Sequence, residues 1–124
     1  MSTQLKMLYR NAIDFITFVK LDAPDFAPED KLTCETAVAR IRCFLADIQD
    51  AEKNEVALRW LKLSGQDVDR AEGFFAVKKD SEGRKSLDSA RTYLINASMR
   101  KAMDTAFIAG ATGATQDLNS GFPS

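Results

Sequence analysis

The side chains that most often perform chemistry in proteins are scarce in this chain. Its 124 residues include no histidine, so the commonest general base and the imidazole ligands of metal sites are excluded. No glycine-rich loop of a familiar phosphate-binding kind is present. Two pairs of acids, Glu52 with Glu55 and Asp67 with Asp69, could hold carboxylates together for acid–base work. Each pair is better explained as the acidic first turn of a helix, so we expect no enzymatic activity.

The two cysteines do not form a site either. Cys34 and Cys43 fall in one predicted helix, which places them on opposite faces and about 13 Å apart along its axis. They cannot bridge each other while that helix exists, and two thiols do not supply the ligands of a zinc site. We therefore expect no metal or cofactor. Unpaired thiols indicate a reducing compartment, so we predict a cytoplasmic protein, with an intermolecular bridge through Cys43 left open.

Charge and composition restrict the partners. The chain has 17 Lys and Arg against 18 Asp and Glu, so no overall field draws it to nucleic acid or anionic lipid. Its 45% hydrophobic and 28% charged residues are those of one globular domain. The apolar run at the N-terminus contains Arg10, Asp14 and Lys20 and is not followed by a small-residue cleavage site. We predict neither a signal peptide nor a membrane span.

The elements that must position these side chains are helices throughout. Apolar residues recur at spacings of three and four, which predicts an all-α, single-domain bundle of four to five helices with short antiparallel hairpins at 49–54 and 64–67. The bundle is predicted to span residues 1–109, and the Gly, Ala, Thr and Ser of 110–124 are typical of a flexible tail. The predicted helices cover about 4–21, 28–49, 52–64, 67–77 and 86–109, with continuity of the second and third left open.

Capping residues set the predicted helix ends. Ser2 or Thr3 can cap the first helix, since a hydroxyl there accepts a hydrogen bond from a free backbone N–H. Gly65 stands where a left-handed C-terminal cap is expected, and Asp67 can then cap the next helix. The polar run 78–85 is predicted to be a surface loop before the last helix.

The residues around Gly65 resemble the last two helices of ubiquitin-associated domains. The resemblance covers under a fifth of the chain, and it implies two helices that meet at this glycine. The Met-Gly-Phe/Tyr loop through which such domains contact ubiquitin is missing from the preceding segment, so ubiquitin binding is not carried over. The residues that carry the resemblance are Ala57-Leu58, Ser64-Gly65-Gln66-Asp67-Val68, Ala71 and Phe74-Phe75.

The predicted first helix has more apolar surface than one neighbouring helix can cover. At about 100° per residue, its apolar side chains span roughly 240° of arc, whereas an ordinary surface helix has a stripe little wider than 100°. It must therefore contact several helices or a partner chain. We predict a small, non-enzymatic regulatory module for protein binding or assembly. The bound protein could be a second copy of the chain, in which case the protein would form a homo-oligomer through this helix. The candidate interface residues are Met7, Phe15, Phe18, Phe26 and Phe122.

Two alternatives remain open at this point. A small inhibitor or immunity-type protein that occludes a larger partner would have the same sequence signature. A helical accessory subunit of a nucleoprotein complex would contact phosphates through basic side chains, although the balanced net charge makes nucleic acid an unfavoured partner. The candidate phosphate contacts are Lys78, Lys79, Arg84, Lys85, Arg100 and Lys101.

Overall fold

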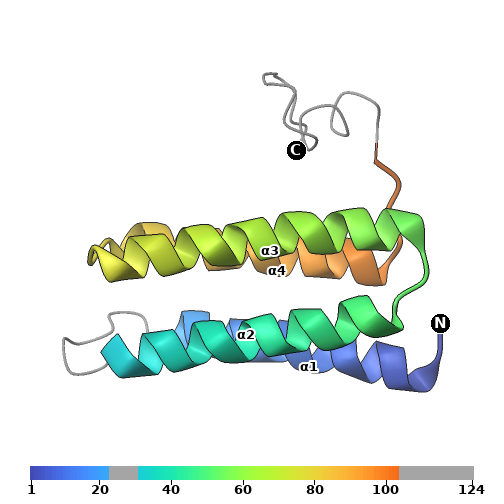
Figure 1. Cartoon of the computed structure of the whole chain (residues 1–124), viewed down its shortest axis with the longest axis horizontal. Coiled ribbons are helices and arrows are strands. Elements are labelled where there is room, and N and C mark those ends of the chain that lie inside the picture. Colours follow the sequence, from blue (N-terminus) through green and yellow to red (C-terminus); the bar gives the residue numbers. More distant parts are fainter. Residues whose placement is uncertain (23–30, 104–124) are drawn as a thin grey trace.

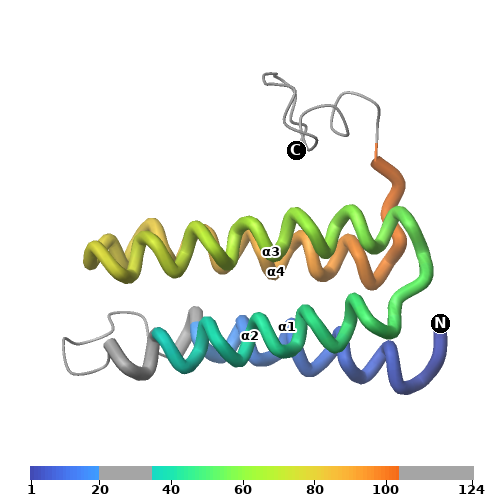
Figure 2. The backbone as a smooth tube through the Cα atoms, viewed as in Figure 1, coloured from blue at the N-terminus to red at the C-terminus, as the bar shows by residue number. Residues whose placement is uncertain are grey.

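The computed structural model describes residues 1–22 and 31–103, and all the regular structure in those residues is α-helical (Figure 1). Successive helices run in opposite directions, with α1 and α2 in one layer and α3 and α4 in the other (Figure 2). Each helix packs mainly against two others, so that α1 closes the ring by contacting α4. The all-helical architecture is therefore confirmed. The helices are α1 (Thr3–Asp22), α2 (Lys31–Ala51), α3 (Glu55–Ala76) and α4 (Asp80–Ser98).

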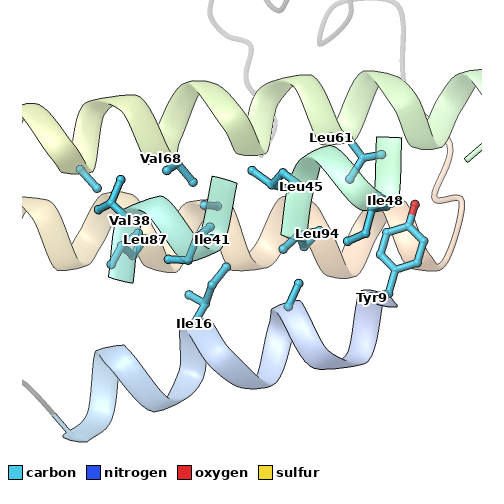
Figure 3. Packing of buried hydrophobic residues seen from close by; sticks show 14 of the residues in the cluster. Tyr9, Ile16, Val38, Ile41, Leu45, Ile48, Leu61, Val68, Leu87 and Leu94 are labelled. Atoms are coloured by element: carbon cyan, nitrogen blue, oxygen red, sulfur yellow. The ribbon is translucent and has the colours of Figure 1, made fainter. Parts of the chain in front are cut away.

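The hydrophobic core lies between the two layers. Each helix turns one apolar stripe inward, because residues three and four apart share a face. In Figure 3, Ile16 of α1 points toward Ile41 of α2 and Leu87 of α4, while Leu61 and Val68 point inward from α3. The stripe of α1 is at most 5% exposed, so this helix is part of the core along most of its length. That stripe is Leu5, Tyr9, Ala12, Ile16 and Val19.

Two helix starts follow the capping chemistry of the sequence. The Ser2 Oγ accepts a hydrogen bond from the backbone N–H of Leu5 at 3.1 Å, so Ser2, one of the two predicted caps, caps α1. At the start of α3, the Oδ1 of Asn54 accepts a hydrogen bond from the N–H of Ala57 at 2.9 Å. The break between α2 and α3 thus falls at residues 52–54, inside the predicted hairpin at 49–54.

The predicted turn at 64–67 is wrong, because α3 runs without interruption from Glu55 to Ala76. Gly65 lies inside the helix, and Asp67 is a buried helical residue instead of an N-cap. Burying one continuous stripe outweighs the roughly 1 kcal/mol that glycine costs within a helix. The two-helix resemblance to ubiquitin-associated domains therefore does not hold in the structure. The apolar part of the stripe is Ala57, Trp60, Leu61, Val68, Ala71 and Phe75.

The predicted surface loop at 78–85 is also wrong, since α4 already begins at Asp80. Only three residues, 77–79, connect α3 to α4. Lys78 adopts a left-handed backbone conformation with φ of 63°, and the N–H of Lys79 donates to the carbonyl of Phe74 at 2.8 Å. This is the hydrogen bond of a glycine-type helix end, formed here without glycine. Acids in the first turn, Asp80 and Glu82, favour the earlier start of α4.

The last helix is shorter than predicted. It ends at Ser98, and Arg100 adopts the left-handed conformation with φ of 50°. The N–H of Lys101 donates to the carbonyl of Asn96 at 3.0 Å, which closes this end in the same way as the end of α3. The rest of the predicted extension to residue 109, and the predicted tail at 110–124, lie beyond the described residues.

Candidate functional site

The outward face of α1 carries two large apolar side chains in contact with solvent. Met7 is 56% exposed and Phe18 is 59% exposed, whereas the inward face of the same helix is closed. At about 100° per residue, the step of eleven residues from Met7 to Phe18 returns the helix to within about 20° of the same direction. Met7 and Phe18 therefore lie on one line along the helix, about three turns apart.

Two polar residues fill the line between these apolar ends. Asn11 and Asp14 lie four and seven positions after Met7, which places them on the same outward stripe. Both are exposed, and so is Arg10 on the flank of the stripe. We name the set Met7, Asn11, Asp14 and Phe18 the outer stripe of α1. The sequence prediction did not include Asn11 and Asp14 as interface residues. Their spacing from Met7 and Phe18, at i, i+4, i+7 and i+11, could have identified them.

Phe15 plays a different part from the other predicted interface residues. Its ring is half-buried and lies against the ring of Phe44 in α2, with centroids 5.8 Å apart. The guanidinium of Arg40 sits over the Phe15 ring, 5.8 Å from its centroid. Phe15 therefore joins α1 to α2, and it extends the apolar surface from Phe18 toward the edge of the core.

The premise that α1 has excess apolar surface holds only in part. Its inward stripe is buried by the chain's own later helices, and Leu8 and Ile13 are partly buried against the same core. Among residues 3–19 of the helix, the large apolar side chains that remain exposed are Met7 and Phe18, one toward each end. The exposed apolar surface is therefore smaller than the 240° arc indicated. Phe26 and Phe122, the other two candidates, lie outside the described residues.

A buried carboxylate at one end of the bundle is a second polar feature. Glu52 is 3% exposed, and the Tyr9 hydroxyl donates a hydrogen bond to its Oε1. Its Oε2 accepts from the N–H groups of Lys53 at 3.1 Å and Asn54 at 3.0 Å, and from the Arg100 guanidinium at 2.7 Å. The carboxylate thus holds α1, the α2–α3 connection and the end of α4 together.

The protonation of this group follows from its contacts. Burial acts to raise the pKa of Glu52, but the Tyr9 hydroxyl, the Asn54 N–H and the Arg100 charge outweigh burial, so the pKa lies below its ordinary value. Burial, and then the neighbouring Glu52 carboxylate, raise the pKa of Tyr9. A carboxylate held ionised beside a neutral phenol has neither a proton to give nor an open position for a substrate. We interpret this cluster as structural.

Asp67 is the other buried acid, and its environment is the reverse. Burial raises the pKa of Asp67, and the adjacent Arg70 guanidinium only partly offsets that effect. Its Oδ1 is paired with Arg70, whose side chain is largely exposed, and its Oδ2 is buried without a hydrogen-bond partner in the described structure. Burial, and then the charge of Asp67, also raise the pKa of Tyr93.

The acid pairs considered in the sequence do not come together as sites. Glu55 is exposed in the first turn of α3, as predicted, but Glu52 precedes that helix and is buried with Arg100. The prediction that Asp67 and Asp69 form the first turn of a helix is wrong, because both lie in the middle of α3. Asp69 accepts from Arg42 of α2 at 2.7 Å and is far more exposed than Asp67. Among residues 1–22 and 31–103, no group of three His, Cys, Asp or Glu side chains could hold a metal ion.

The basic residues of the nucleic-acid alternative are divided between the two ends of α4. Lys78 and Lys79 are exposed just before α4 and Lys85 is exposed in its second turn. Arg100 and Lys101 follow the other end of the helix, about 22 Å or more away along its axis. Arg100 is also engaged by Glu52. The sixth candidate, Arg84, is only partly exposed, with its Nη1 buried. The six side chains therefore do not form one phosphate-binding surface.

None of the four helices, within the part that is described, combines the length and the uniform apolarity that a bilayer crossing needs.

Comparison of the chain with protein-family models, with curated proteins and with solved structures finds no match. The outer stripe of α1 is a surface on which exposed apolar and charged side chains are aligned.

Proposed function

We propose that this protein is a non-enzymatic binding or assembly module that uses the outer stripe of α1 to contact a protein. The observation that supports this most is the exposure of Met7 and Phe18, at 56% and 59%, on one line of a helix whose opposite face is closed. Helices that bind other helices commonly do so through large apolar side chains aligned on one face. A partner helix laid along α1 would cover both side chains at once.

The expected partner and cellular location follow from exposed side chains. A protein partner, or a second copy of the chain, would remove Met7 and Phe18 from water, at a gain of about 1.5–3 kcal/mol for each side chain fully buried. The exposed thiol of Cys43 favours a reducing compartment, so the cytoplasm is the proposed location. A regulatory role by occlusion of a larger partner would use the same face.

Site-specific photo-cross-linking tests the proposal. A photoreactive phenylalanine analogue is placed at position 18 or at position 7 of the full chain, in cells of the organism that encodes it. The expected result is a discrete cross-linked product from both positions, because both lie in the contact.

Val77 provides the matched control. It is apolar and 63% exposed, but it follows the C-terminal end of α3, a helix that packs mainly against α2 and α4 and does not carry the outer stripe. The analogue at position 77 is expected to give no discrete product. Equal products from positions 18 and 77, or none from position 18, would overturn the proposal.

A further inference from the structure

The outer stripe of α1 has a symmetry that identifies its partner, and the inference rests on the proposed function of that surface. The four residues are spaced by four, three and four positions, and their order is apolar, polar, polar, apolar. Reversing the helix direction leaves both the spacing and the order unchanged. The stripe therefore matches a second copy of itself laid antiparallel, about a two-fold axis between residues 12 and 13.

In that register the apolar ends meet. Met7 of one copy lies opposite Phe18 of the other, and the pairing occurs twice because of the two-fold axis. A methionine sulfur against an aromatic ring is a favourable contact. Phe15 lies one turn before Phe18 and carries the apolar surface toward Phe44, so Met7 of the second copy would meet more than one ring.

The charges are also complementary in this arrangement. Arg10 and Asp14 are exposed, and neither belongs to an ion pair within residues 1–22 and 31–103. Antiparallel pairing brings Arg10 of one copy to the level of Asp14 of the other within about 1.5 Å along the axis, again twice. Asn11 then lies opposite Asp14 and can donate to its carboxylate. A parallel pairing would instead set Asp14 against Asp14.

We infer that the partner of this surface is a second copy of the chain, bound through antiparallel α1 helices with Met7 opposite Phe18 and Arg10 opposite Asp14. Two such helix faces cover less than the 1,200–2,000 Å² or so that is usual for a stable interface. The dimer is therefore weak and forms in a concentration-dependent way.

Charge reversal tests the inference by sedimentation equilibrium of the full chain, from about 10 µM to about 1 mM. Arg10→Asp and Asp14→Arg each place like charges opposite each other twice, so each variant alone is expected to associate about tenfold more weakly. An equimolar mixture of the two variants restores both attractions, because every contact then joins an acid to an arginine. The mixture is expected to associate as well as the wild type.

The mixture is decisive because neither variant regains a favourable pair within its own chain. Asp47→Arg, on an exposed acid of α2, is the matched control and is expected to associate like the wild type. Circular dichroism checks that α1 stays helical in each variant. A mixture no heavier than its separate components, or a wild type that stays monomeric throughout, would overturn the inference. A cross-link from position 18 to a different protein would then retain the proposed function without self-association.

Discussion

Glu52 shows how a single residue can join parts of the chain that are distant in sequence. Its carboxylate accepts hydrogen bonds from Tyr9, which precedes it by 43 positions, and from Arg100, which follows it by 48. It also satisfies the free N–H groups of Lys53 and Asn54 in the turn between α2 and α3. The sequence indicated only an acid near a helix start, because the donors come from elements that meet only after folding.

The charge of Glu52 is expected to contribute to stability in a pH-dependent way. Glu52→Gln removes a buried partner of Arg100, so it should lower the free energy of unfolding at pH 7 by about 2–4 kcal/mol. The folded-state pKa lies below the unfolded value of about 4.3, so this contribution is fully present well above that value and is lost as the pH falls through the folded pKa. Urea unfolding of both proteins from neutral to acid pH measures the gap between them.

The control for this prediction is Asp47→Asn, an exposed acid on α2, which should change stability by no more than about 0.5 kcal/mol. The gap between wild type and Glu52→Gln should narrow as the pH falls. A gap of constant size down to pH values where carboxylates are protonated would show that the charge of Glu52 is unimportant.

At the scale of the element, glycine does not occupy the helix ends, where it is usually found. Gly65, Gly73 and Gly83 all lie inside helices, while Lys78 and Arg100 take the left-handed positions that end α3 and α4. Gly83 has a packing reason, because a methyl group there would overlap the ring of Phe75. The close contact of α3 with α4 is also marked by Ser64, whose hydroxyl donates to the carbonyl of Ala90 at 2.8 Å.

Alanine substitutions separate these roles. Gly65→Ala should stabilise the protein by about 0.5–1 kcal/mol, because the position is helical and nothing lies within 4 Å of the added methyl. Gly83→Ala should destabilise it by about 1–3 kcal/mol, because the Phe75 ring must move in a closed core. Thermal and urea unfolding measure both. Loss of stability in Gly65→Ala would mean that α3 is broken at this glycine, as the sequence had indicated.

At the scale of the whole molecule, the four helices share one core. The stripes of α1 and α2 meet those of α3 and α4 between the layers, and polar contacts also cross them. Arg42 of α2 pairs with Asp69 and Glu72 of α3, and Arg91 of α4 donates to the Thr17 hydroxyl of α1. These side chains are largely exposed or only partly buried, so the shared apolar core contributes most of the cohesion.

A shared core predicts cooperative unfolding. Trp60, the single tryptophan, stacks on Tyr93 and donates to the carbonyl of Lys101, so its fluorescence reports on α3 and α4. Far-ultraviolet circular dichroism reports on all helices. The two urea transitions should coincide, as for a two-state domain. Loss of a quarter or more of the helical signal before the fluorescence changes would show that α1 detaches independently.

The sequence by itself determined the helical class, and it favoured a cap at Ser2 or Thr3 and a break between α2 and α3. Each is a local property, because apolar spacing and capping act within a few turns. The same local rules failed at Gly65 and at residues 80–85, where burying the stripe of α3 and packing Gly83 on Phe75 outweigh the preference for a turn. Only tertiary structure decided which side chains stay outside. Of the three candidates that the sequence named on α1, Met7 and Phe18 are exposed and Phe15 is half-buried, while Glu52 is buried. Exposure depends on how many neighbours the other helices bring, and the sequence of one helix does not contain that information.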